Sequence, residues 1–111
     1  MGDVRQLRQR STVEPLWREV LGTQLRAIRL RRRGTITTTA QRAGISAQYL
    51  SEIERGRKDP SSEIVAAIAG ALDCTLAEVT DLTVRELRRE SARLGLAPAP
   101  ASMRGPVALA A

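Results

Sequence analysis

The 111-residue sequence contains no histidine, no phenylalanine and a single cysteine, Cys74. One cysteine cannot form an internal disulfide, and a chain without histidine lacks a usual ligand of zinc, so we expect neither a metal site nor a cofactor. The chain also has no glycine-rich phosphate loop and no cysteine in a charged setting, which argues against an enzyme. We expect Cys74 to be packed in the interior rather than to sense redox state.

Apolar runs long enough to span a membrane are also missing, and no positively charged leader precedes an apolar segment. A chain of this length forms one domain, near the lower end of the size at which a single core is stable. We therefore expect a one-domain cytoplasmic protein, and the residues make no small-molecule ligand evident.

Positive charge, by contrast, is plentiful and unevenly placed. The formal net charge is +6, but residues 1–58 hold 13 arginine or lysine residues against five acidic residues, whereas the remainder holds five against seven. A strongly basic half is the distribution expected of a protein that binds the phosphates of nucleic acid.

The stretch from Gly44 to Gly56, GISAQYLSEIERG, has the spacing of a tight turn followed by a short helix. Ala40 is small where a second helix would cross, and Gly44 can take a positive φ in the turn. Ser46 suits the N-cap of the short helix, and Gly56 lies where a left-handed residue would end it. This spacing is typical of a helix-turn-helix, whose second helix enters DNA.

A helical period of 3.6 residues divides the short helix into two faces. The inward face carries Ile45, Leu50 and Ile53. The outward face carries mostly short polar residues that we predict to read base edges, namely Ser46, Ala47, Gln48, Ser51 and Glu52. Gln48 can pair with adenine, and Glu52 can accept from cytosine. The residues that we predict to contact phosphates are Arg42, Tyr49, Arg55, Arg57 and Lys58.

With this motif followed by Glu-Arg-Gly, the sequence resembles the phage-repressor and Cro-like, or Xre-type, helix-turn-helix transcriptional regulators. The resemblance covers about Leu21 to Leu82. It implies an all-α fold, a five-helix lambda-repressor-like DNA-binding domain, with the helix-turn-helix over Ile36 to Arg55. It also implies a buried ion pair between Arg29 and Glu54, which would tie the first helix to the end of the recognition helix.

Two positions depart from the pattern of this family. Members often have glutamine, which contacts a phosphate, where this chain has Ile36, and often leucine where it has Thr39. The first departure puts one phosphate contact in question and leaves the fold unaffected. One recognition helix reads only a half-site, so we expect a homodimer on a palindromic operator of double-stranded DNA.

We expect five helices within a DNA-binding domain over residues 15–82. The first runs from Pro15 to near Arg32, with Trp17 in the core or at a dimer contact. The residues expected to begin the later helices are Thr35, Ser46, Ser61 and Thr75, the last with Glu78 in a capping box.

The segments outside this domain are expected to differ from it. Residues 1–14 form a flexible basic arm, which could follow a phosphate track or be a solvated tail. Thr83 and Glu86 repeat the capping-box spacing, which predicts a C-terminal helix over 83–95, separate from the fifth or continuous with it. Its single apolar stripe could hold a second subunit or pack back on the domain.

Residues 96–111 are rich in proline and alanine, and we expect a disordered tail. The last four residues are similar to the end of the tag that directs stalled bacterial proteins to Clp-type proteolysis, and they are Ala108, Leu109, Ala110 and Ala111. The segments LWREVLG, YLSEIERG and SSEIVAAIAGALD resemble the actinobacterial regulators of Clp protease genes, the ClgR and PopR type. This resemblance implies an unstable activator with RNA polymerase and Clp protease as partners.

Other functions stay open on the residues alone. An antitoxin-type autorepressor would join the same DNA-binding module to a toxin protein, and a nonspecific bridging factor of the same fold would show little base preference. A helical protein-binding module would turn the outward face toward another protein. Neither activation nor repression can be read from these residues.

Overall fold

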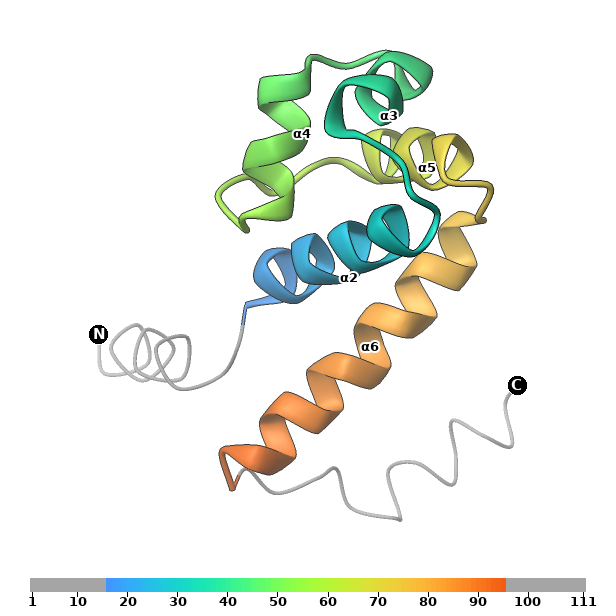
Figure 1. Cartoon of the computed structure of the whole chain (residues 1–111). Helices are drawn as coiled ribbons and strands as arrows, with labels where there is room; N and C mark the ends of the chain where they lie inside the picture. Colours follow the sequence, from blue (N-terminus) through green and yellow to red (C-terminus); the bar gives the residue numbers. More distant parts are fainter. Residues whose placement is uncertain (1–15, 96–111) are drawn as a thin grey trace.

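The computed structural model describes residues 16–95, which form five α-helices and contain no strand (Figure 1). In chain order they are α2 (Trp17–Arg31), α3 (Ile36–Ala43), α4 (Ala47–Glu54), α5 (Ser62–Ala71) and α6 (Leu76–Arg93). The predicted all-α class is confirmed. The predicted basic arm over 1–14 and the tail over 96–111, with its degradation signal, lie outside the described residues.

Short polar side chains begin four of these helices at the predicted positions. The hydroxyls of Thr35, Ser46 and Ser61 each accept a hydrogen bond from the backbone N–H three residues further on, at 3.0 to 3.3 Å. Thr75 accepts in the same way from Glu78, whose carboxylate accepts from the N–H of Thr75 at 2.9 Å. Each cap satisfies a backbone donor that the helix leaves free and contributes about 1 kcal/mol.

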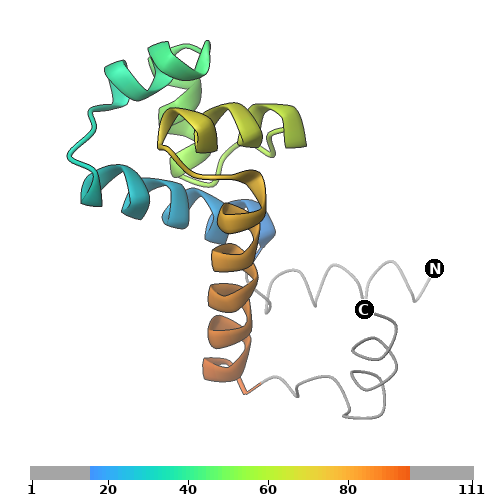
Figure 2. The ribbon, with the colours of Figure 1, turned by 90° about the vertical axis from the view of Figure 1, so that its right-hand side faces the viewer.

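Helix α2 lies at the centre of the fold. It packs against α4 and α6, while α3 packs against α4 and α5, and α5 packs against α6. Figures 1 and 2 show α4 above α2 and α6 descending past it. The largest fully buried apolar side chains come from α2, α4, α5 and α6, and they are Leu21, Leu25, Leu50, Ile53, Ile68 and Val79. This shared core holds α4 by its inward face, as the sequence predicts for Leu50 and Ile53.

Helix α6 is uninterrupted, so the predicted fifth helix and the added helix over 83–95 are one element. The prediction that Thr83 caps a new helix is wrong, and the continuous alternative is confirmed. The side chain of Thr83 is fully buried, and its hydroxyl donates to the carbonyl oxygen of Val79 at 2.8 Å. Because the hydroxyl bonds back to its own helix, it offers the backbone no competing turn.

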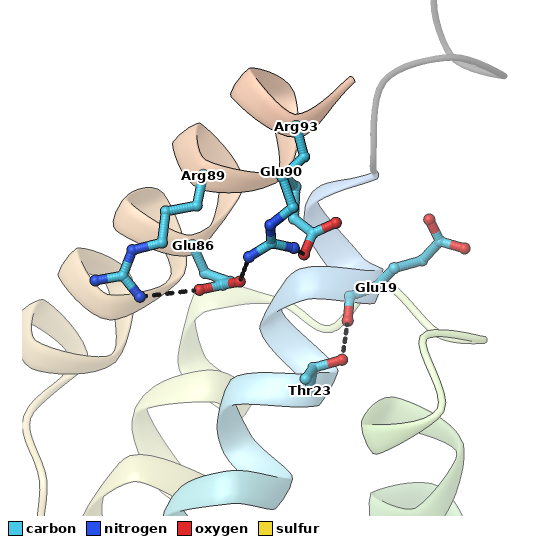
Figure 3. Close-up of polar contacts among 6 residues, drawn as sticks. All are labelled: Glu19, Thr23, Glu86, Arg89, Glu90 and Arg93. Atoms are coloured by element: carbon cyan, nitrogen blue, oxygen red, sulfur yellow. Dashed lines mark hydrogen bonds and ion pairs between the residues drawn. The ribbon is translucent and has the colours of Figure 1, made fainter. Parts of the chain in front are cut away.

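The second half of α6 carries a row of paired charges beside the start of α2 (Figure 3). The carboxylate of Glu86 accepts from Arg89 at 3.3 Å and from Arg93 at 3.2 Å, and Arg93 also bonds to Glu90. The arginines are largely exposed, so each pair contributes only a few tenths of a kcal/mol. These pairs support the helical state of α6 where it leaves the core.

Two large apolar side chains near the ends of the described segment are exposed. Trp17, in the first turn of α2, is 38% exposed, so the prediction that it packs in the core is wrong, and its role at a dimer contact stays a prediction. Leu94, after the last turn of α6, is 51% exposed. No helix between residues 16 and 95 is long and apolar enough to cross a bilayer.

Candidate nucleic-acid interface

A tight turn joins α3 to α4. Gly44 takes the left-handed conformation there, with φ 76° and ψ 27°. Its N–H donates to the carbonyl of Gln41 at 3.2 Å, and the N–H of Ile45 donates to that of Ala40 at 3.0 Å, which satisfies the end of α3. A Cβ on Gly44 would meet no atom within 4 Å, so the backbone angle alone requires glycine. The predicted role of Gly44 is confirmed.

Two glycines allow the end of α4 to lie directly against α2. A Cβ on Gly22 would stand 2.3 Å from the carbonyl oxygen of Ile53 and 2.7 Å from that of Glu54. A Cβ on Gly56, which has φ 75° as the sequence predicts, would stand 2.9 Å from the Cα of Glu19. The two backbones therefore meet without side chains between them. No local sequence pattern predicts this contact of Gly22.

The buried ion pair expected between Arg29 and Glu54 is present. The guanidinium Nε donates to one carboxylate oxygen at 2.8 Å and Nη2 to the other at 2.9 Å, while Nη1 donates to the carbonyl of Gly34 at 3.0 Å. The hydrogen bond to Glu54 raises the pKa of the Arg29 guanidinium above its ordinary value, although burial opposes this. The guanidinium therefore stays charged, and its hydrogen bonds fix α4 relative to α2 and to Gly34.

A second contact holds the loop that follows α4. The Nε of Arg18 in α2 donates to the carbonyl of Gly56 at 3.1 Å. Arg57 and Lys58 come directly after this carbonyl, and both are exposed. Arg18 thus positions the start of the basic loop, a role that the sequence alone does not show.

The residues predicted to read bases lie along one side of α4. Ser46 and Gln48 are exposed, and Ala47, Ser51 and Glu52 are half-buried. The hydroxyl of Ser46 already caps α4, and the carboxylate of Glu52 lies 3.8 Å from the ammonium of Lys58. Gln48 carries the single side-chain amide among these five residues, and it is exposed. The role of all five residues stays a prediction.

A concavity of about 440 Å³ adjoins this face. It is lined by Ile36 at the start of α3, by Ser51 and Arg55 on and just after α4, and by Arg26 on α2. Arg26 and Arg55 are both exposed, so two guanidiniums flank a hollow beside α4, which we call the reading helix. Sequence reasoning missed Arg26, although it precedes Arg29 by one helical turn and shares its side of α2.

The remaining predicted phosphate ligands are not gathered in that hollow. Tyr49 is half-buried and packs against the core. Arg42 lies at the end of α3, where its guanidinium is 3.6 Å from the carboxylate of Asp73. Phosphate binding by Arg42 stays a prediction, and its place in the structure is beside the junction of α5 and α6.

Comparison with known proteins places this geometry in a family. The helix-turn-helix pattern matches residues 25–79, which include α3, the turn and α4. A transcriptional regulator, ClgR, of Mycobacterium tuberculosis is 46% identical over 76 residues, which are 68% of this chain and 68% of that protein. The chain belongs to the Xre-type helix-turn-helix family.

Solved structures agree with this family assignment and include a ClgR protein. The crystal structure of the clp gene regulator ClgR from Corynebacterium glutamicum has a TM-score of 0.69 and 39% identity, covering 72% of this chain and 85% of that one. A mutant of the restriction-modification controller protein C.Esp1396I shares the fold, with a TM-score of 0.62 at 18% identity over 67% of this chain and 94% of that one. Within the family, this chain is a relative of ClgR.

Proposed function

We propose that this protein is a transcriptional regulator that recognises double-stranded DNA by sequence, with α4 in the major groove. The observation that carries this is the way α4 is held. Its inward side is locked to α2 through Gly22 and the Arg29–Glu54 pair, while Gln48 stands free of the domain on the other side. A rigid helix that presents an amide to solvent suits the bidentate reading of adenine.

Phosphate contacts would fix the register of α4 on the duplex. We assign them to the exposed cations nearest to the reading face, which are Arg26, Arg55, Arg57 and Lys58, with the hydroxyl of Tyr49. Arg26 and Arg55 together supply two guanidiniums beside Ile36, the position at which other family members often have glutamine. In our proposal these arginines replace the contact that isoleucine cannot make.

The operator would be a palindrome bound by a homodimer. One α4 reads a single half-site, and two subunits spaced about 34 Å apart read two turns of the groove on one side of DNA. The exposed apolar residues Trp17 and Leu94 and the half-buried Val84 and Leu87 are the surface that we assign to the second subunit. Burial of this surface between subunits would remove the apolar area that the monomer leaves in water.

The relatives suggest which genes are controlled. ClgR of Corynebacterium glutamicum is described as a clp gene regulator. We propose that this chain activates Clp protease genes through contact with RNA polymerase, and that Clp protease degrades it through Ala108, Leu109, Ala110 and Ala111. The regulator would then accumulate when protease capacity falls, and adding two aspartates after Ala111 should lengthen its half-life in cells.

The function is tested by incubating the purified protein with fragmented genomic DNA of its own organism near physiological salt and sequencing what is retained. An inverted repeat upstream of Clp protease genes is the expected result. Recovery of its own promoter alone would favour an antitoxin-type autorepressor. No enrichment, with the Gln48→Ala variant behaving like the wild type, would contradict sequence-specific binding and favour a bridging or protein-binding role.

A further inference from the structure

A second hollow lies on the opposite side of the domain from α4. It is an open cleft of about 690 Å³ where the end of α2, α3, the end of α5 and the start of α6 meet, and no residue of α4 lines it. Figures 1 and 2 show this junction on the face turned away from α4. A volume of this size is typical of a small-molecule site. Of the residues predicted to contact DNA, only Arg42 lines it.

The lining of this hollow carries three arginines and two carboxylates, so it has an excess of one positive charge. Arg31 and Arg32 at the end of α2 are exposed on its rim, and among residues 16–95 neither has a carboxylate within 4.0 Å. Of the two acidic residues that also line the hollow, Asp73 faces Arg42 at 3.6 Å. Glu78 is held by the cap at Thr75, and the nearby charge of Arg32 makes only the smallest contribution to lowering its pKa. Two guanidiniums are therefore available to an anion that enters the hollow.

The floor is apolar. Ile28 and Leu72 are buried, Leu82 is half-buried, and all three line the hollow. The thiol of Cys74 lies between floor and rim, with its sulfur 3.9 Å from Nη2 of Arg32. The sequence alone does not predict this contact, because Arg32 is distant from Cys74 in the chain. An apolar floor beside two guanidiniums is complementary to a molecule with an apolar body and one anionic group.

We propose that this hollow binds a small organic anion, with its carboxylate or phosphate at Arg31 and Arg32 and its apolar body on Ile28, Leu72 and Leu82. The proposal requires no DNA, so it can be tested whether or not the regulator has the operator proposed above. The amino-acid sequence alone makes no such ligand evident, because the residues that line the hollow are distant in the chain.

One chain of contacts links this hollow to the reading helix. Gly34 lines the hollow, and its carbonyl accepts from Nη1 of Arg29, whose other nitrogens hold Glu54 at the end of α4. A ligand held between the end of α2, the end of α5 and the start of α6 steadies the end of α2, next to which Gly34 makes this contact, and it should therefore tighten DNA binding. By linkage, DNA should tighten ligand binding by the same factor. This second statement rests on the proposed function.

The probe is hexanoate, compared with neutral hexanol and with acetate, which has the charge but little apolar body. Hexanoate should slow the alkylation of Cys74 by iodoacetamide at least threefold at saturation, and hexanol and acetate should have little effect. Amide chemical shifts of Gly34 and Cys74 provide a second reading, should Cys74 react slowly. The double variant Arg31→Gln/Arg32→Gln should lose both responses. Arg33→Gln/Arg88→Gln, which removes the same charge from exposed residues outside the hollow, should keep them.

Equal responses to hexanoate and hexanol, or a response that persists in Arg31→Gln/Arg32→Gln, would overturn the anion site. Protection of Cys74 by hexaglutamate but not by hexanoate would also overturn it and would assign the rim to an acidic partner protein. The linked effect is measured on an operator half-site, where hexanoate should increase affinity severalfold. A response of Cys74 without any DNA binding would contradict the proposed function and leave the ligand site standing.

Discussion

The Cα of Gly22 faces the backbone of Ile53 so closely that a Cβ would lie 2.3 Å from the carbonyl oxygen of Ile53. The obstacle is backbone, so it cannot rotate away as a side chain could. The crossing of α2 and α4 is therefore set at a distance that only glycine permits. Any residue with a side chain at position 22 must push the reading helix outward.

We predict that Gly22→Ala lowers the free energy of unfolding by about 2–3 kcal/mol, because steric strain at the crossing exceeds the gain of about 1 kcal/mol from alanine in a helix. Gly70 provides a matched control, since it lies in α5, is exposed and has no atom within 4 Å of an added Cβ. Gly70→Ala should stabilise the protein by about 0.5–1 kcal/mol. Urea denaturation measures both, and a stabilised Gly22→Ala would contradict the close crossing.

Glu54→Ala should lower the free energy of unfolding by about 3–5 kcal/mol, because it leaves the Arg29 guanidinium buried without its partner. Arg29→Met/Glu54→Leu should cost much less than the sum of the single changes, since no charge is then left buried. Thermal unfolding of the wild type, Arg29→Met, Glu54→Leu and the double variant measures the coupling energy between the two side chains. Unchanged thermal stability of Glu54→Ala would show that this pair contributes nothing.

Gln48→Ala and Arg57→Ala should weaken DNA binding in different ways. Loss of the Gln48 amide should relax base preference at one operator position by about 1–3 kcal/mol. Loss of the Arg57 charge should weaken binding to all sequences alike and reduce the slope of log affinity against log salt by about 1. Affinities for a panel of operator variants at several salt concentrations separate the two, and identical behaviour would refute the assignment of base and phosphate roles.

Arg26→Ala and Arg55→Ala should each reduce the salt slope by about 1 without changing base preference, because both guanidiniums flank the hollow beside α4. Arg85→Ala is the matched control, since Arg85 is also exposed but lies on α6 and pairs with Asp81 at 3.0 Å. The control should bind DNA like the wild type. If Arg26→Ala also did so, α2 would take no part in phosphate binding.

The cap at Thr75 should make stability depend on pH. Its hydrogen bonds, chiefly that from the Thr75 N–H, hold the pKa of Glu78 below its ordinary value of 4.5. The cap therefore stabilises the fold above that ordinary pKa, and its contribution is lost as the pH falls through the lowered value. Glu78→Ala should lower the melting temperature at neutral pH, and the difference should shrink as the pH falls below the ordinary pKa of 4.5 and through the lowered value. Glu63→Ala, which removes a carboxylate from the first turn of α5 without a capping box, is the control for the loss of a negative charge at the start of a helix.

Local features of the fold could be predicted because their causes lie within a few residues. Thr35, Ser46 and Ser61 cap helices through their nearest backbone donors, and Gly44 turns the chain by its own backbone angle. Thr83 shows the limit of this reasoning. Its capping-box spacing with Glu86 is the same as that of Thr75 with Glu78, yet Thr83 is buried inside a continuous helix, so tertiary packing decides between the two outcomes.

In the candidate site too, features with local causes could be predicted, and features that depend on tertiary packing could not. The outward face of α4 follows from helical periodicity, and the pair of Arg29 with Glu54 follows from the resemblance to the family. Gly22 and Arg26 were missed because their roles depend on what lies across the helix crossing, which periodicity does not specify. For Trp17 the core alternative is wrong and the dimer contact stays a prediction, because its apolar spacing is that of a core residue but α2 begins there, at the edge of the core.

The continuity of α6 has a mechanical consequence. Eighteen residues without a break form a stiff rod about 27 Å long, anchored at one end in the core that holds α4. If a second subunit bound at the far end of α6, the stiff helix would limit rotation of one subunit relative to the other. The distance and orientation between the two α4 helices of the dimer would then be fixed. In the proposed dimer, changes of base between the half-sites would be tolerated, whereas insertion of a base pair would turn one α4 away from its groove.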